Sequence, residues 1–99
     1  MMVIEQIHLD PWKHPETHVA LPPDYEVLRT DTLPNGHYAL WLLYDGDEPP
    51  GDRLIRVVAC NEAQHALRFE FPKHHRFLGG IHPPDFDTCY YLFDVTDGE

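Results

Sequence analysis

Apolar and polar residues alternate over several short stretches of the chain, and proline or glycine separates these stretches. Alternation with a period of two places successive side chains on opposite faces of a β-strand. The chain also contains 10 prolines, and a proline inside a helix removes a backbone donor and clashes with the preceding turn. The pattern therefore predicts short strands rather than long helices.

Eight segments have the residue pattern of strands. They are residues 3–9, 18–21, 25–33, 37–44, 53–60, 66–71, 76–81 and 88–95. Pro34-Asn35-Gly36 predicts a hairpin between two of them, because Asn-Gly tolerates positive φ. Residues 38–44 are apolar on both faces, which predicts a central strand covered on two sides. We further expect a helical turn at 61–66 and a strand that is weakened or bulged at Gly79-Gly80.

These elements predict the all-β class and one domain over residues 1–99. The expected architecture is a small antiparallel sandwich or partly open barrel of about seven short strands, with at most one short helical turn. Strand aromatic residues are expected in its core, namely Trp41, Tyr44, Phe69, Phe71, Phe77, Tyr91 and Phe93.

The charge balance narrows the range of partners. Lys and Arg number 7 against 17 Asp and Glu, so the formal net charge is −10. Phosphate rows and anionic lipid surfaces repel such a chain, which argues against direct binding to nucleic acid or to a membrane. A basic protein surface is the partner that this charge favours.

The stretch YDGDEPPGDR concentrates the acidic residues. It places Asp45, Asp47, Glu48 and Asp52 in a proline-stiffened connection, for which we expect a hairpin or a corner. The spacing does not match a helix–loop–helix calcium site. Three interpretations stay open: a looser cation site from Asp45, Asp47 and Asp52, a solvated connection, and a recognition loop that loses little entropy on binding.

Other residues extend the candidate contact surface. Asp85 and Asp87 belong to an acidic C-terminal fifth of the chain, together with Asp94, Asp97 and Glu99. If this segment lies beside the Asp45–Asp52 connection, one merged surface would imitate the phosphates of a nucleic acid. Trp12, in a proline-bounded loop, is a candidate anchor for a partner or a cover for the end of the sheet.

Cysteine and histidine residues suggest further chemistry. Cys60 and Cys89 are the only cysteines and the start of the chain lacks a signal-peptide pattern, which predicts a cytoplasmic protein with reduced thiols. A bridge between them requires two strands that place them side by side. Cys60, His65, His82 and Cys89 are an alternative zinc set, although their spacing matches no compact zinc motif. Protonation of all 8 histidines would change the formal charge from −10 to −2.

Signs of catalysis are few. The chain contains no serine, and LGGIHPP lacks the Lys-Ser/Thr of a phosphate loop. A thiol at Cys60 near Glu62 and His65 is a weak hint of a nucleophile with a base. We therefore expect a protein that is not an enzyme and that uses no cofactor.

Several segments resemble a family of small uncharacterised proteins of tailed phages and prophages. The resemblance covers most of the chain and includes VALP, ALWLLYDGDEP, RLIRVVAC, FLGGI and YYLFD. Family members typically carry Thr-Gly-His after the middle strand and a Trp-His-x-Phe-Glu-like ending. Cys60-Asn61-Glu62 and residues 90–94 stand there instead, so no family site carries over. The resemblance implies a phage accessory protein that acts in the host cytoplasm by binding a host protein.

These observations predict a small acidic binding protein, a phage-encoded inhibitor or modulator that occludes a basic, nucleic-acid-binding type of surface on a host protein. One alternative is a virion assembly subunit that pairs through strand edges, for which a homo-oligomer is expected. The other alternative is the small Cys/His metalloprotein.

Overall fold

A computed structural model of the chain describes residues 1–11, 13–34, 37–61, 66–68, 70, 75–82 and 87–96. Within these residues the chain forms seven strands and no helix. The strands are β1 Met2–Leu9, β2 Glu16–Leu21, β3 Glu26–Thr32, β4 Tyr38–Asp45, β5 Gly51–Asn61, β6 Arg76–Ile81 and β7 Thr88–Asp94.

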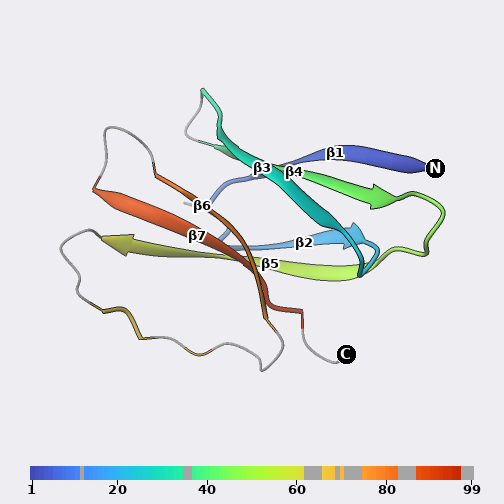
Figure 1. Ribbon diagram of the computed structural model, residues 1–99. Helices are drawn as coiled ribbons and strands as arrows, with labels where there is room; N and C mark the ends of the chain where they lie inside the picture. The colour runs from blue at the N-terminus through green and yellow to red at the C-terminus, as the bar shows by residue number, and fades with distance from the viewer. Residues whose placement is uncertain are drawn as a thin grey trace.

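The strands build two antiparallel sheets. Sheet A has the order β1-β4-β3, and sheet B has the order β2-β5-β7-β6. In Figure 1, sheet A lies above sheet B as an open, sandwich-like pair of layers. The predicted all-β class, with about seven short antiparallel strands in a sandwich, is confirmed.

Alternating residues of both sheets meet in one core. Leu40 and Leu42 of β4 have no exposed surface, and neither do Ile55 of β5 and Leu92 of β7. The buried hydrophobic cluster comprises Ile7, Leu9, Leu21, Tyr25, Tyr38, Leu40, Leu42, Ile55, Leu78, Ile81, Tyr90 and Leu92. Removing this apolar surface from water is the main force that holds the layers together.

Two local predictions are confirmed. β3 and β4 pair as a hairpin, closed by a hydrogen bond from the Leu33 amide to the His37 carbonyl at 2.8 Å, while residues 35–36 lie outside the described residues. β6 shifts register against β7 between Phe77 and Gly79. Gly79 has φ of +144°, and a Cβ there would lie 3.2 Å from the Thr30 Cγ2 atom of β3, so both backbone and space favour glycine.

The predicted strand 66–71 is wrong for the residues that the structure describes. Ala66, Leu67, Arg68 and Glu70 are exposed and lie in no strand, and residues 69 and 71 lie outside the described part. Alternation defines which face a strand would bury, but it supplies no neighbouring strand to complete the ladder. The helical turn predicted at 61–66 falls mostly on residues 62–65, which are also outside the described part, and Asn61 itself ends β5.

The aromatic core differs from the predicted one. Phe77 is 59% exposed and Tyr91 is 38% exposed, so their assignment to the core is wrong. Both project from the outer face of sheet B, whereas the register places Tyr90 on the inner face. β4 is central in its sheet, as predicted, but its outward Trp41 is only half-buried. Aromatic content identified the strands without specifying which of their faces meets the other sheet.

Candidate functional site

The acidic connection between β4 and β5 is a corner that leads the chain from sheet A to sheet B. Its turn is ordered by local hydrogen bonds. The Asp47 amide donates to the Asp45 Oδ1 atom at 2.9 Å, and the Glu48 amide donates to the Asp45 carbonyl at 3.2 Å. A Cβ at Gly46 would lie 2.9 Å from the Val3 Cγ2 atom, so a larger residue would force Val3 to shift and the close packing of the turn against β1 favours glycine.

The carboxylates of this corner point to different partners. Asp47 accepts a hydrogen bond from the Met1 amino group at 2.5 Å, and Asp45 lies 3.6 Å from the same nitrogen. The Asp47 hydrogen bond, helped by the Asp45 charge, raises the pKa of this amino group against an opposing desolvation effect. Asp52 instead faces His18 of β2, with Oδ2 at 3.0 Å from the His18 Nδ1 atom.

The cation site proposed for Asp45, Asp47 and Asp52 is therefore wrong. Its carboxylates diverge toward β1 and β2, and the described residues contain no cluster of three or more His, Cys, Asp or Glu side chains suited to a metal ion. What the corner presents outward is negative charge on an ordered turn.

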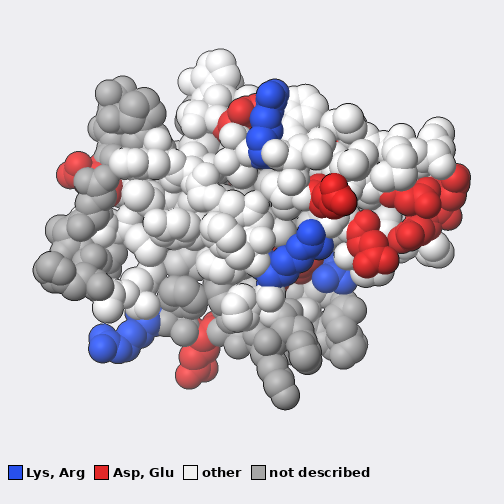
Figure 2. Space-filling model, in the orientation of Figure 1, with Lys and Arg blue, Asp and Glu red and all other residues white. Residues whose placement is uncertain are grey.

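Tertiary structure adds two carboxylates that the sequence analysis missed. Asp24 lies in the connection between β2 and β3, and Glu26 begins β3. The connection starts after Leu21, which pairs with Gly51 at the start of β5. It ends at Glu26, which pairs with Leu43 near the end of β4. This connection therefore lies beside the β4–β5 corner. Asp24 and Glu26 are both exposed. We call the resulting surface the acidic end, and it comprises Asp24, Glu26, Asp45, Asp47, Glu48 and Asp52. Figure 2 shows acidic side chains gathered at the right-hand end of the molecule.

Two arginines border the acidic end, and each makes a specific internal contact. The Arg53 Nε atom donates to the Asp94 Oδ2 atom at 3.0 Å, and Arg53 is only 15% exposed. Arg76 stacks on the Tyr25 ring at 4.4 Å from its centroid and donates to the Tyr25 carbonyl at 2.6 Å. The Arg53 charge is matched by a buried carboxylate, so it offsets little of the outward negative charge.

Asp94 anchors this end from within the core. Its carboxylate accepts hydrogen bonds from the Tyr25 hydroxyl at 2.6 Å, the Arg53 Nε atom at 3.0 Å and the Thr96 amide at 3.0 Å. Burial alone would raise the pKa of Asp94, but the hydrogen bonds from Thr96, Tyr25 and Arg53 outweigh burial and lower it. Burial and the Asp94 contact raise the pKa of Tyr25. The network ties the segment before β3 to both β5 and β7.

Asp87 and Asp94, the C-terminal acids that the structure describes, do not join the acidic end. Asp87 precedes Thr88, the register partner of Asn61, so it lies at the opposite end of β5. The ten residue steps from Gly51 to Asn61 span about 33 Å in an extended strand. Asp94 is buried, with 2% exposure. The merged surface that included Asp87 is therefore wrong, and Asp85, Asp97, Glu99 and the candidate anchor Trp12 lie outside the described residues.

A shallow apolar groove lies on the outer face of sheet A. It has a volume of about 210 Å³ and is lined by Ile4, Leu28, Arg29 and Trp41. Arg29 stacks on the Trp41 ring at 5.4 Å, and the Trp41 Nε1 atom donates to Asp31 at 2.9 Å. Ile4 is 63% exposed, so this face has apolar surface available for contact.

The alternative metal set is only partly assembled in the described structure. Cys60 and Cys89 are register partners, and both are unbridged and half-buried. His82 follows β6 and is exposed, and His65 lies outside the described residues. No three-ligand group forms among the residues that the structure describes.

Comparison of the chain with protein-family models, with curated proteins and with solved structures found no match. The resemblance to phage proteins therefore stays a prediction. In the described part of the chain there is no helix of the length and apolar character that a membrane crossing needs.

Proposed function

We propose that this protein is a non-enzymatic binding module whose acidic end docks onto a basic surface of another protein. The observation that carries the proposal is the convergence of six carboxylates, from two inter-strand connections and from the strand ends that adjoin them, on a single end of the molecule. If the resemblance to phage proteins holds, the partner is a host protein, and docking would occlude a surface that otherwise holds nucleic acid.

The fold supports this use of the acidic end. The corner is held by its own turn hydrogen bonds and by the close packing of Gly46 on β1, so binding would order little additional chain. Complementary charge accelerates encounter and selects the partner, whereas apolar contacts add affinity. The groove at Ile4, Leu28 and Trp41 is an adjacent source of such contacts.

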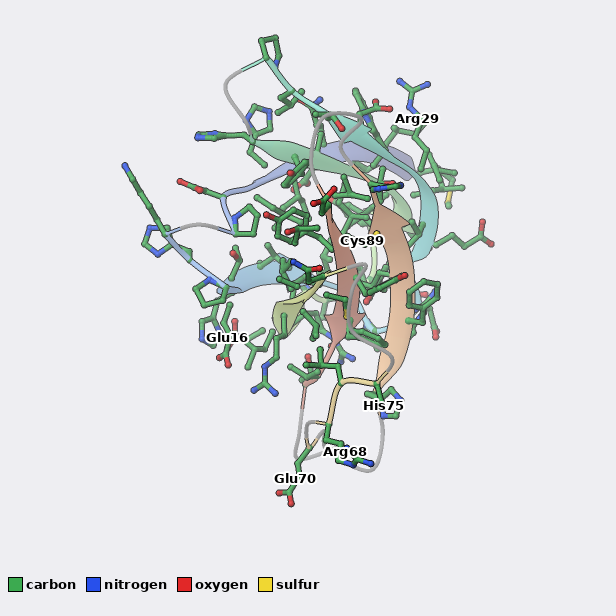
Figure 3. The ribbon with its side chains drawn as sticks, turned by 90° about the vertical axis from the view of Figure 1, so that its left-hand side faces the viewer. Glu16, Arg29, Arg68, Glu70, His75 and Cys89 are labelled. Atoms are coloured by element: carbon green, nitrogen blue, oxygen red, sulfur yellow. The ribbon has the colours of Figure 1, made fainter. Side chains whose placement is uncertain are left out.

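Reversing two charges of the acidic end should weaken binding about tenfold or more, because like charges would then face the basic partner. The variant combines Asp24→Lys with Glu48→Lys, which avoids Asp45 and Asp47 and their contacts to the turn and the amino group. Its matched control combines Glu70→Lys with Asp87→Lys. Both acids are exposed, Asp87 lies at the other end of β5, and Figure 3 shows Glu70 at the lower margin of the molecule. Both variants raise the net charge by the same amount.

The measurement starts from capture of proteins from a bacterial lysate at about 0.05 M salt, followed by affinity measurement with the purified binder. We expect the binder to be retained by wild type and by the control variant and to be lost by the acidic-end variant. If both variants kept the wild-type affinity, another surface would make the contact. If both variants lost affinity equally, only net charge would matter.

Binding should also weaken as the pH falls from about 8 to about 5.5, because the ordinary pKa of a histidine side chain is about 6.5 and protonation of histidines reduces the net negative charge. The His18 Nδ1 atom lies 3.0 Å from the Asp52 Oδ2 atom at the acidic end. Titrations at several pH values and salt concentrations provide the measurement. An affinity that is flat in both pH and salt would exclude charge as the driving force.

The edge of sheet A favours a second candidate function, assembly with further copies of the chain. Among the described residues β1 pairs only with β4, and its outward positions include the exposed Met2 and Ile4. The strand contains no lysine or proline. Such an edge can pair with another strand. Sedimentation of the pure protein separates the candidates, because assembly requires a stable homo-oligomer and the first proposal does not.

A further inference from the structure

Cys60 and Cys89 stand directly opposite each other on neighbouring strands. They are register partners in the antiparallel pair of β5 and β7, which shows no bulge between Ile55 and Asn61. Directly opposite residues project to the same face, and the inward Tyr90 and Leu92 place that face on the outside of sheet B. Both thiols are half-buried, so small molecules can reach them. Figure 3 looks onto this end of the molecule and labels Cys89.

The backbone hydrogen bonds of β5 show whether Cys60 and Cys89 form a hydrogen-bonded or a non-hydrogen-bonded pair. The Val57 amide donates to the Pro15 carbonyl at 2.8 Å, so the backbone of Val57 points toward β2. The Leu54 carbonyl accepts from the Val95 amide at 2.9 Å, so the backbone of Leu54 points along the β7 side. Because the backbone N–H and C=O groups of successive residues point alternately to the two neighbouring strands, those of Cys60 point toward β7, as those of Leu54 do.

The cysteines therefore occupy a hydrogen-bonded position of the ladder. In such pairs the Cα atoms lie about 5.5 Å apart, which is within the range of about 4.4–6.8 Å that disulfides use. Their Cβ atoms lie near the upper end of about 4.5–5.5 Å, whereas a relaxed disulfide needs about 3.5–4.5 Å. A bond can form here, but it must pull the two strands away from ideal ladder geometry.

We propose that Cys60 and Cys89 are a site of reversible oxidation, a dithiol that closes to a strained and readily reduced cross-strand disulfide. Glutathione disulfide is the oxidant. One cysteine thiolate attacks it, forms a mixed disulfide and releases one glutathione. The other thiolate attacks the protein sulfur of that mixed disulfide and releases the second glutathione. Two thiols become one disulfide, and the electrons and protons leave on two glutathione molecules. Strain favours the reverse reaction in a reducing compartment.

The site is independent of the proposed binding function, because it lies at the end of β5 opposite the acidic end. The disulfide would join the end of β5 to the start of β7, and β6 lies between these two points along the chain. Oxidation would therefore add a covalent link between β5 and β7 without changing the corner at Asp45–Asp52.

The test is a redox titration of the full chain in glutathione buffers, quenched by thiol alkylation and followed by intact mass and peptide mapping. We expect an intramolecular Cys60–Cys89 link, a mass loss of about 2 Da and an unchanged β-sheet circular dichroism spectrum. Cys89→Ala should stop at the mixed disulfide with glutathione. Absence of the internal link at every buffer ratio in folded protein would overturn the proposal.

A shifted-pair variant tests the strain. It combines Cys60→Ala and Cys89→Ala with Asn61→Cys and Thr88→Cys, which moves the thiols to the next register pair, a non-hydrogen-bonded position with closer Cβ atoms. Half-reduction of this variant should require a glutathione buffer whose ratio of reduced to oxidised glutathione is at least about tenfold higher than the ratio that half-reduces the native pair. If the native disulfide proved equally hard or harder to reduce, the inference of a strained, labile bond would fail.

Discussion

Replacing Asp94 with alanine is expected to lower the free energy of unfolding by about 3 to 5 kcal/mol. The carboxylate is 1% exposed and accepts hydrogen bonds from Tyr25, Arg53 and Thr96. Its removal would leave the buried Tyr25 hydroxyl without its acceptor and would take from Arg53 the carboxylate that matches its charge. Denaturant unfolding at about pH 7, followed by circular dichroism, measures the loss.

Asp31→Ala is the matched control for Asp94→Ala. Asp31 also accepts from an aromatic side chain, Trp41, and pairs with an arginine, Arg29, but it is 39% exposed. Exposed ion pairs contribute about 1 kcal/mol or less, so the control should lose little stability. Comparable losses in the two variants would contradict the importance that we assign to burial of Asp94.

The same network determines an acid dependence of stability. The pKa of Asp94 is lowered in the folded protein. Its ionised form therefore adds to the free energy of unfolding above the unfolded pKa of about 3.9, and this contribution is lost as the pH falls through the folded pKa. Wild type should therefore lose more stability than Asp94→Ala between about pH 4 and pH 2. The pKa of Tyr25 is raised, so its contribution is present below about pH 10 and is lost as the pH rises toward the folded pKa.

Leu42→Ala is expected to cost about 2 to 5 kcal/mol, through lost apolar burial and the cavity that remains. Leu42 has no exposed surface and lies in the core cluster with Ile55 and Leu92. The adjacent Leu43 points to the outer face of sheet A and is only half-buried, so Leu43→Ala should cost about 1 kcal/mol. Unfolding midpoints of the two variants give the comparison, and equal costs would contradict the assignment of the inner face.

These expectations bear on the proposed function, because stability and binding are assigned to different residues at the same end of the molecule. Asp94, Tyr25 and Arg53 hold the end together from inside, whereas Asp24 is exposed and Glu48 is half-buried. Variants of the second set should change affinity with little change in stability. That separation allows a loss of binding to be distinguished from a loss of the fold.

Much of the fold could be predicted from the sequence. Alternation, β-branched and aromatic composition and proline spacing located each of the observed strands to within about two residues, because these features depend on neighbours along the chain. Asn35-Gly36 and Gly79-Gly80 similarly predicted a hairpin and a bulge from backbone freedom alone. The strand expected at 66–71 failed because no local pattern supplies a partner for its backbone.

The candidate sites depended on both the local sequence and the tertiary structure. The sequence by itself determined the acidic corner, since Asp45, Asp47, Glu48 and Asp52 are close along the chain. Only the tertiary structure placed Asp24 and Glu26 beside it, sent Asp87 to the other end, buried Asp94 and set Cys60 opposite Cys89. The physical reason is that strand order and register are decided by which apolar faces pack together across the whole core, and residues far apart in sequence become neighbours only through that packing.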